Sequence, residues 1–475
     1  MASLKASAEF RASNPKGSTQ DEIASDAPQL RELAQKFPTL LIYTHSAEAY
    51  EQVRPYFNAA VAQQPLAIAR PRSVEEVSAV VQEAQSKGIP FGIRAGGHDM
   101  SGGQAQGKDG IIIDLRAIDG AEIAEDRKSV RVGGGAVSIN LAKFLNEHDL
   151  VTPHGWCATV GVAGWALGGG YGYSSAFYGL GVDQVLGAKL VLAGGRVVDA
   201  DDHPDLLWAL RGAGNGTLGI VVELRLKLYD PTAFLGGLVG FPSDETADVL
   251  AKFGEFERDL PVNFTGEISQ MTLPGVGSLL VWIFAWTSDD DNLEEGRAFL
   301  KKLKSLGTPL LDTVAQVDDY TFFNSFPYPA NVHWYPRLRA VEYLSPEVSQ
   351  VIADNLAPGP ASVTVIHKVH GRALEENPGA CFPLRKPHRL VNPTAAVSDA
   401  STQASDFEEY KQWARGFVEE LSDEGLALPY GYRNLGPDED TNWVATYGEE
   451  TLARLKDIKL KFDPDNVFDK GHPRL

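Results

Sequence analysis

The sequence predicts an α+β protein built in two parts, and its length and two successive patterns support this. At 475 residues the chain exceeds one typical domain, so two domains are expected. Between residues 61 and 231, short apolar runs alternate with amphipathic segments, as strands and helices do. Between residues 232 and 428 the apolar runs become longer, and helical segments separate them. An antiparallel sheet with helices on one face would bury that second pattern.

Local signals place the elements of the first part. The run PLAIARP at residues 65–71 predicts the first strand, and SVEEVSAVVQEAQSKG after it predicts a helix. Ser73 would cap this helix, Glu76 would complete a capping box, and Gly88 would end it. Further strands are predicted at IPFGIRAGG, GIIIDLRAI, SVRVGGG, AKLVLAG, GRVVDA and GIVVELRLKL. Helices are predicted at HPDLLWALRGAG and at SINLAKFLNEHDL, the latter capped by Ser138.

The second part and the two ends complete the organisation. Long strands are predicted at FLGGLVGF, NFTGEISQMTL, LLVWIFAWT and SVTVIHKVH, and helices at DETADVLAKFGEFERDL, NLEEGRAFLKKLKSL and SDFEEYKQWARGFVEELS. The first sixty residues are polar and helix-prone, and an amphipathic helix near the C-terminus stops at Asp463 and Pro464. The expected segments are an N-terminal arm at 1–60 packing on the first domain, a first domain at 61–231, a second domain at 232–428, and a segment at 429–475 that returns to the first domain.

Composition narrows the function classes. A net charge of −20 and a pI near 5.0 disfavour binding to nucleic acid or to an anionic membrane. The longest apolar stretch, residues 279–286, is too short to span a bilayer. The N-terminal residues show no apolar signal segment, and Cys157 and Cys381 allow at most one disulfide. We expect a monomeric cytoplasmic protein, or a secreted one if a signal was removed.

Two strong nucleophiles stand in glycine-rich segments. His98 lies in RAGGHDMSGG at residues 94–103, and Cys157 lies in HGWCATVGVAGWALGGGYGYSS at residues 154–175. Glycine allows backbone N–H groups to approach a bound group closely, because no Cβ intervenes. Two such segments, each with one nucleophile, suit a large phosphorylated cofactor that lies across two loops and is bonded covalently at two points.

Other motifs favour ordinary structural roles. GAGNGTLG at residues 212–219 precedes a strand instead of a helix, so a tight turn is expected there and not a nicotinamide site. LGGGYG at residues 167–172 lacks the Lys-Ser/Thr pair of a P-loop. His367 and His370 are three apart on a strand and cannot chelate one metal together, so we expect structural histidines. The acidic run at residues 288–292 lacks calcium-loop spacing. No metal site is predicted.

Four motifs taken in order resemble a known family. RAGGHD, GWCATVGVAGWALGGGYG, DLLWALRGAGNGTLGIVVELRLKL and the tail YRNLGPDED with YGEETLARLKDIKLKFDPDNVF are similar to the berberine bridge enzyme-like oxidases of the vanillyl-alcohol oxidase superfamily. The resemblance implies a two-part PCMH-type FAD-binding domain and an antiparallel-sheet substrate domain. It further implies bicovalent FAD, with His98 bonded to the flavin 8α-methyl carbon and Cys157 to ring carbon C6.

The resemblance also implies the residues around the cofactor. Those expected along the diphosphate are Arg94, Gly96, Gly97, Asp99 and Ser101, and those expected beside the flavin are Val160, Gly161, Gly164, Gly168, Gly169, Tyr171, Gly172, Val221 and Asn434.

The resemblance points to catalytic candidates as well. Tyr432 and Tyr171 match active-site tyrosines, and packing roles remain equally open for both. A tyrosine acts as a base only if neighbours depress its pKa from about 10. Val160 matches a gatekeeper beside flavin C4a that leaves room for oxygen. Met100 stands where many plant members carry a tyrosine, so the catalytic arrangement is expected to differ from theirs.

The expected activity is a two-electron oxidation of a small molecule. Hydride would pass from an alcohol or natural-product substrate to flavin N5, and O2 would reoxidise the flavin and give H2O2. One alternative is a sugar oxidase that forms a lactone, with Trp282, Trp286 and Trp334 stacking on sugar rings. Another is a flavin-carrying binding protein without effective turnover. A dehydrogenase that passes its electrons to an acceptor other than O2 lies between this alternative and an oxidase. Substrate contacts from the strand after CFPLRKPHR are in doubt, because NPTAAVSD replaces the family's usual aromatic residues.

Overall fold

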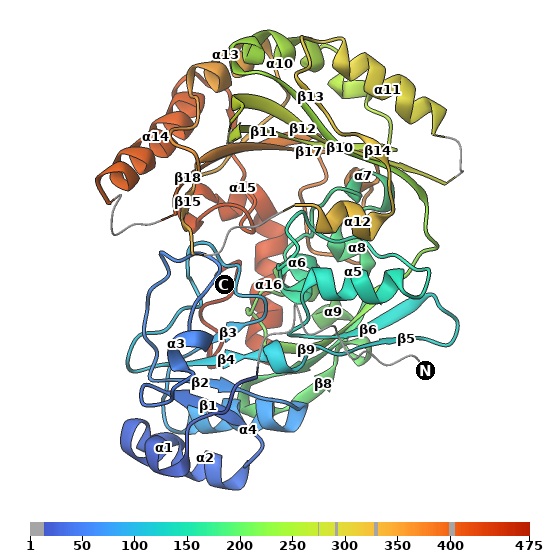
Figure 1. Cartoon of the computed structure of the whole chain (residues 1–475). Helices are drawn as coiled ribbons and strands as arrows, with labels where there is room; N and C mark the ends of the chain where they lie inside the picture. Colours follow the sequence, from blue (N-terminus) through green and yellow to red (C-terminus); the bar gives the residue numbers. More distant parts are fainter. Residues whose placement is uncertain (1–13, 274, 290–292, 327–330, 399–403) are drawn as a thin grey trace.

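The computed structural model describes residues 14–273, 275–289, 293–326, 331–398 and 404–475. Two lobes face each other (Figure 1): one holds two smaller sheets, and the other holds a large sheet under a layer of helices. The predicted α+β class is confirmed. Residues 290–292, the last three of the acidic run at 288–292, lie outside the described residues.

The first lobe contains a four-stranded and a five-stranded sheet. The four-stranded sheet has the order β1-β2-β4-β3, with β1 antiparallel to β2 and the other pairs parallel. Its strands are β1 (Leu41–Thr44), β2 (Ala67–Arg70), β3 (Phe91–Arg94) and β4 (Ile111–Asp114). The antiparallel sheet has the order β5-β6-β9-β7-β8. Its strands are β5 (Ala121–Ile123), β6 (Ser129–Gly133), β7 (Val185–Val191), β8 (Val197–Asp199) and β9 (Ile220–Lys227).

The first sheet begins earlier than the sequence predicted. β1 pairs with β2 over its whole length, so a strand from the expected N-terminal arm is part of the sheet. Its residues LIYT form an apolar run too short to stand out among the polar, helix-prone residues around it. The helices of this region are α1 (Gln20–Asp26), α2 (Arg31–Lys36) and α3 (Tyr50–Val53).

At the starts of two predicted helices, the hydrogen bonds differ from those that the sequence predicted. In α4 (Val74–Ser86) the Ser73 hydroxyl accepts from Glu76 N as expected, but the Glu76 carboxylate accepts from Arg72 N, so the capping box is not closed. Helix α5 (Ser138–Asn146) has Val137 at its cap position, because the Ser138 hydroxyl donates to Val160 O. Other helices of this lobe are α6 (Val162–Leu167), α7 (Ser175–Tyr178), α8 (Gly181–Gln184) and α9 (Pro204–Ala213).

The second lobe is one large antiparallel sheet. The strand order is β13-β10-β12-β11-β17-β18-β16-β19, with β14 on β10 and β15 on β18. The long strands are β10 (Ala233–Pro242), β11 (Phe264–Leu273), β12 (Gly277–Ser288), β17 (Val363–Val369) and β18 (His388–Val397). The short ones are β13 (Leu311–Asp312), β14 (Ala315–Gln316), β15 (His333–Pro336), β16 (Arg339–Val341) and β19 (Ala427–Leu428).

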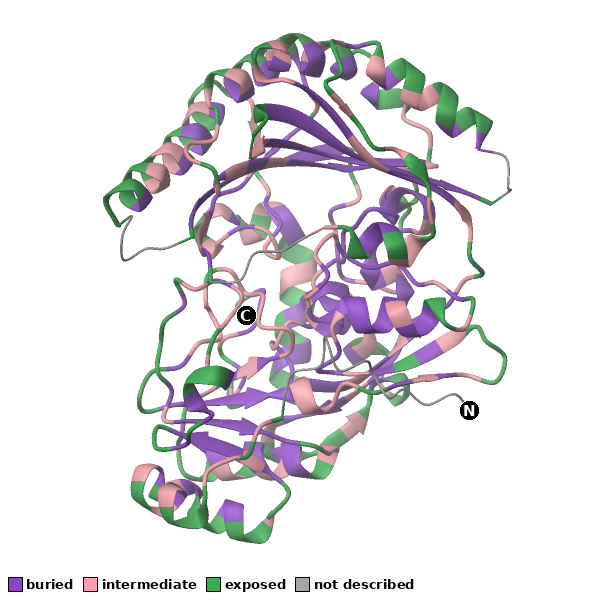
Figure 2. Cartoon of the chain, in the orientation of Figure 1, coloured by how far each residue is buried: buried purple, intermediate pink, exposed green. Residues whose placement is uncertain are grey.

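Four helices form a layer over the outer face of this sheet. They are α10 (Thr246–Gly254), α11 (Glu294–Lys304), α13 (Pro346–Asp354) and α14 (Ala404–Asp423). Figure 2 shows the sheet buried and the outward sides of these helices exposed. Trp282 and Trp286 are 0% and 3% exposed in the core between sheet and helices. The expectation that they stack on a substrate is therefore wrong, because they face away from the first lobe.

The C-terminal residues pack on the first lobe. Helix α15 (Trp443–Tyr447) leads into α16 (Glu449–Phe462), which contacts α9. From the middle of the chain, α12 (Asp319–Asn324) also reaches the first lobe and lies against α5. Leu455 and Ile458 of α16 belong to the first lobe's core. The buried ammonium of Lys459 donates to Thr217 O, 2.7 Å away, and joins the helix to the loop before β9. In the part of the chain that the structure describes, no helix is long and apolar enough to cross a membrane.

Asp114, at the end of β4, neutralises three buried or partly buried arginines. Its carboxylate lies 2.8 Å from Arg70, 2.8 Å from Arg94 and 2.9 Å from Arg116. Burial alone would raise the pKa of Asp114, but Arg116, Arg94 and Arg70 hold that pKa far below its usual range. The carboxylate therefore supports the fold as long as it is ionised.

We predict that Asp114→Asn lowers the free energy of unfolding by about 3–5 kcal/mol, because it leaves buried guanidinium groups unpaired. Urea titration measures this change. Since the folded pKa is depressed, the stabilisation is present above the unfolded pKa of about 4 and is lost as pH falls toward the folded value. The difference in the free energy of unfolding between wild type and variant should therefore become smaller in acid. Exposed Asp109→Asn is the control, and an equal loss in both variants would contradict the prediction.

Candidate active site

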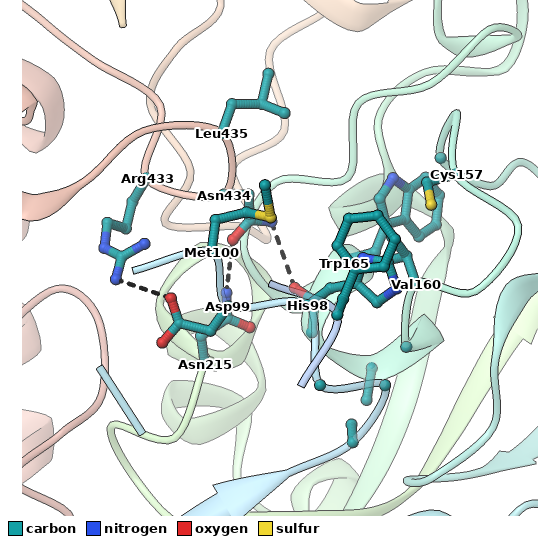
Figure 3. Close-up of a pocket in the computed structure, with 18 of the residues that line it drawn as sticks. His98, Asp99, Met100, Cys157, Val160, Trp165, Asn215, Arg433, Asn434 and Leu435 are labelled. Carbon is teal, nitrogen blue, oxygen red and sulfur yellow. Dashed lines mark hydrogen bonds and ion pairs between the residues drawn. The ribbon is translucent and has the colours of Figure 1, made fainter. Parts of the chain in front are cut away.

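A large cavity lies between the two lobes (Figure 3). It contains about 2050 Å³ of space outside protein atoms, part of it open to solvent. Its walls come from the loops after β3 and before α6, from the loop before β9, from the inner face of the large sheet, and from residues 432–436. The two glycine-rich segments and the proposed substrate domain therefore meet at one site.

His98 and Cys157 both line this cavity, and Thr159 stands between them. The Thr159 hydroxyl oxygen is 2.9 Å from His98 Nε2 and 3.7 Å from Cys157 Sγ. The two loops touch through their backbones, since a Cβ on Gly96 would lie 2.2 Å from Gly161 N. Only glycine permits that approach. The structure thus brings together the two nucleophiles that the sequence singled out.

The surroundings set the ionisation of both groups. Burial lowers the pKa of His98 to about 3, so its imidazole is neutral at physiological pH. The Phe57 ring stacks on it with centroids 4.1 Å apart. Burial raises the pKa of Cys157 to about 11, and hydrogen bonds from Thr159 and the Val160 backbone oppose this rise. His98 is ready to act as a neutral nucleophile, whereas Cys157 depends on groups that stabilise its thiolate.

The structure places most of the other predicted site residues at the cavity. Those that line it are Arg94, Gly96, Gly97, Asp99, Val160, Gly161, Gly164, Tyr171, Val221, Tyr432 and Asn434. The guanidinium of Arg94 turns away to Asp114 and to the carbonyl of Val53. Four predicted residues do not line it: Ser101, Gly168, Gly169 and Gly172.

The three glycines pack closely against other parts of the protein. A Cβ on Gly168 would lie 2.4 Å from the Asn215 amide, and one on Gly172 would lie 1.9 Å from His154 O. Gly169 has a φ of +123° and faces the ring of Phe382. Their lack of a side chain serves protein packing. The Ser101 hydroxyl donates to the Asp99 carboxylate at 3.1 Å.

An ion pair ties the His98 loop to the C-terminal segment. Asp99 Oδ1 accepts from Arg433 at 3.3 Å, as Figure 3 shows. Burial alone would raise the pKa of Asp99, but Arg433, His472 and the Ser101 hydroxyl hold it below its usual value. The Asp99 side chain thus joins two parts of the chain, whereas the sequence analysis considered only its place along the diphosphate.

The two predicted active-site tyrosines are buried. Burial raises the pKa of both Tyr171 and Tyr432, the opposite direction from that required of a base. The Tyr432 hydroxyl oxygen accepts from Gly170 N at 3.1 Å and from Asn434 Nδ2 at 3.3 Å. Both phenols keep their protons at neutral pH, so they suit hydrogen-bond donation to a ligand better than proton removal.

Sequence reasoning missed a polar pair on the sheet. His367 of β17 lies across from Glu267 of β11, since Ile268 pairs with Ile366, and both side chains line the cavity. His367 Nδ1 is 2.8 Å from Glu267 Oε2, a close contact without hydrogen-bond geometry, and the Tyr171 ring meets the imidazole edge-on with centroids 4.9 Å apart. His367, for which a structural role was expected, therefore lines the cavity, and its role stays a prediction. A carboxylate within a predicted strand, at Glu267, was the signal available in the sequence.

The neighbouring strand adds two more polar residues that the sequence analysis did not expect. Asn392 and Thr394 of β18 pair with Val365 and Val363 of β17, and all four line the cavity. This strand therefore does reach the site, although aromatic residues are missing from it. Trp334, on β15, is the one of the three considered tryptophans that lines the cavity.

The GAGNGTLG turn is also part of the site. Gly214, Asn215 and Gly216 line the cavity. Asn215 Nδ2 donates to Asn434 Oδ1 at 2.9 Å, while Asn215 Oδ1 is buried without a hydrogen-bond partner among the described residues. A tight turn was expected and is present, with a φ of +73° at Gly216, but it additionally presents a polar group to the cavity.

Comparisons with known proteins agree with this geometry. A family model described as an FAD binding domain matches residues 65–201, and one described as berberine and berberine like matches residues 431–472. The chain is 34% identical over 489 residues to the FAD-linked oxidoreductase aurO of Gibberella zeae, covering 100% of this chain and 93% of that protein. The chain belongs to the berberine bridge enzyme-like FAD-linked oxidoreductases. It is an FAD-dependent oxidoreductase.

Solved structures share the fold. 6-Hydroxy-D-nicotine oxidase from Arthrobacter nicotinovorans has a TM-score of 0.81 at 23% identity, covering 91% of this chain and 97% of that one. Glucooligosaccharide oxidase from Acremonium strictum has a TM-score of 0.78 at 23% identity, covering 92% and 97%. The latter structure is described as carrying a 6-S-cysteinyl, 8α-N1-histidyl FAD.

The cavity fits FAD by its own features. Beyond its own helix, a Cβ on Gly164 would meet no protein atom within 4 Å, so this glycine of α6 leaves open space where a ring can pass. The unpartnered Asn215 oxygen offers an acceptor beside it. Val160 and Val221 provide apolar surface for a flat ring system. Within the described ranges, no three His, Cys, Asp or Glu side chains gather as a metal site.

Proposed function

We propose that this chain is an oxidase whose FAD is bonded to both His98 and Cys157, and that it oxidises a hydroxylated, largely apolar small molecule with O2 as acceptor. One observation carries the proposal: two nucleophilic side chains from separate loops meet at one cavity, with Thr159 in contact with both. The doubly linked flavin of the glucooligosaccharide oxidase supports the same assignment for the same residue types.

The chain's residues would hold FAD along the two loops. Gly164 would leave room for the flavin, Val160 and Val221 would contact it, and Asn215 and Asn434 would supply polar groups. When bound, FAD takes a hydride from the substrate and passes two electrons to O2, giving H2O2. Val160 lines the cavity, and its short side chain would leave room for oxygen there.

The large sheet would bind the substrate. Its cavity face is apolar at Val363 and Val365 and polar at the Glu267–His367 pair, while Phe57 and Trp334, with ring centroids 6.0 Å apart, form an aromatic wall. Such a surface suits a flat apolar body with few hydroxyl groups, because unpaired polar groups are costly to bury. His367 Nε2 would accept the hydroxyl proton while Glu267 orients the ring, and Tyr171 and Tyr432 would donate hydrogen bonds to the substrate oxygen.

Sugar oxidation is the second candidate, and the glucooligosaccharide oxidase supports it. The site counts against it, because Trp282 and Trp286 face the outer core and only Trp334 of the three can stack on a sugar ring. A binding protein without turnover is disfavoured because the cavity carries proton-accepting groups next to the cofactor site.

A substrate panel tests the proposal. We expect phenolic benzylic and allylic alcohols to bleach the flavin without air and to release H2O2 in air, and glucose oligomers to do neither. Peroxide release from the sugars alone would establish the second candidate. Failure of every compound to bleach the flavin would contradict the proposed turnover and leave the binding-protein function.

A further inference from the structure

Thr159 occupies the place where the two flavin-linking loops cross. Its neighbours are fixed to the start of α5, since Ile139 N donates to Ala158 O and Ser138 N donates to Val160 O, both at 2.9 Å. Thr159 is not among the residues that line the cavity. Its hydroxyl is therefore held at a set position behind the cavity wall, within reach of both nucleophiles.

On the histidine side, Thr159 engages only one ring nitrogen. The hydroxyl is 2.9 Å from His98 Nε2, and the stacked Phe57 ring, inclined by 21°, restricts rotation of the imidazole. No described residue hydrogen-bonds His98 Nδ1. A neutral imidazole carries one N–H and one bare nitrogen, and the bare nitrogen is the nucleophile. The contact with Nε2 therefore leaves Nδ1 to form the bond.

On the cysteine side, the same hydroxyl lies 3.7 Å from Sγ, within hydrogen-bonding range for sulfur. A threonine hydroxyl has one proton, so it donates to one partner and accepts from another. If it accepts from His98 Nε2–H, its own proton points to Cys157. This single arrangement leaves Nδ1 bare and places a donor against the thiolate, so both nucleophiles become competent together.

We propose that Thr159 is a positioning residue for both attachments: it holds Nε2 of His98 so that Nδ1 joins the flavin, and it donates to Cys157 Sγ as the thiolate forms. The inference rests on the bicovalent attachment proposed above. Each attachment removes one hydrogen from a flavin carbon and one from the side chain, and dioxygen takes both as H2O2. Nitrogen or sulfur supplies the two electrons of each new bond.

Substitution at Thr159 tests this role without any substrate. Thr159→Val keeps the shape and removes the hydroxyl, and Thr159→Ser retains the hydroxyl. Thr152→Val is the control, because Thr152 is a buried threonine of the same loop whose hydroxyl donates to Lys227 O at 2.8 Å. Each protein is incubated in air with added FAD at pH 7 and pH 9. Mass spectrometry after denaturation then measures the flavin linked to each of the two peptides over time.

We expect Thr159→Val to bind FAD non-covalently but to form both covalent links at least about tenfold more slowly at pH 7. The Cys157 link should recover at pH 9, because more thiolate forms there, whereas the His98 link should not recover. Thr159→Ser and Thr152→Val should behave like wild type. A merely structural role for Thr159 would not give this separation of the two links by pH.

The outcomes separate the two proposals. Wild type without covalent FAD would overturn the proposed attachment and this role with it. Wild type with both links, together with a Thr159→Val variant that forms both at the same rate, would overturn the positioning role alone. Attachment through Nε2 of His98, or failure of Thr159→Ser to restore linkage, would also overturn it.

Discussion

Gly164→Leu should yield a folded protein that binds FAD more weakly than wild type. Gly164 lies inside α6, where a Cβ meets no protein atom beyond its own helix within 4 Å, so a leucine side chain would occupy the space assigned to the flavin. Leucine favours a helix over glycine by about 0.8–1 kcal/mol, so the helix itself is not weakened. Overlap with a bound ring costs about 1–3 kcal/mol or more, which is at least about a fivefold loss of affinity. Flavin absorbance per chain measures the loss.

The control for this variant is Gly416→Leu. Gly416 also lies within a helix, α14, and also has nothing beyond its own helix within 4 Å of its Cβ, but it is exposed on the outer face of the second lobe. It should bind FAD like wild type. Circular dichroism should show both variants folded. Full FAD content in Gly164→Leu would mean that the flavin does not pass this glycine.

His367→Gln should slow substrate-driven bleaching of the flavin by about 10²–10⁴-fold, the usual contribution of a general base. Glutamine keeps a polar side chain but does not take up a proton at neutral pH. Glu267→Gln should slow the same step less, because Glu267 acts by orienting the ring, 2.8 Å from Nδ1. FAD content should be unchanged in both. Anaerobic stopped-flow mixing with an active alcohol from the panel measures the rate.

Two further variants test whether the slower bleaching of His367→Gln comes from the loss of a base. Thr364→Val changes the same strand on its opposite side and should leave the rate unchanged, since only Val363, Val365 and His367 of β17 line the cavity. Tyr432→Phe removes one donated hydrogen bond and should slow the reaction by about tenfold at most. A larger loss in Tyr432→Phe than in His367→Gln would make the phenol the base and reject His367.

Local sequence signals identified the cofactor side of the site. His98, Cys157 and the glycines around them are recognisable because nucleophiles and glycines stand next to each other in the chain. The roles of Gly168 and Gly172 were harder to assign, because a glycine that admits a ligand and one that admits a neighbouring backbone look alike in sequence. Their close contacts with Asn215 and His154 appear only in three dimensions.

The substrate side required long-range information. Alternation along β12 and β17 shows which residues share a face, but it cannot show which face helices will cover. For this reason Trp282 was considered as a stacking residue and His367 as a structural one, whereas Trp282 lies in the outer core and His367 lines the cavity. The Glu267–His367 pair depends on the register between β11 and β17, strands about a hundred residues apart in the chain.

The central claim is that one FAD is linked to this chain through His98 and Cys157, and the mass of the denatured protein tests it most directly. We predict a mass equal to the chain plus one FAD less the hydrogens lost on linkage. His98→Ala and Cys157→Ala should each keep a covalent flavin through the remaining bond, and the double variant should keep none. Release of all the flavin from the wild-type protein by acid would contradict the claim.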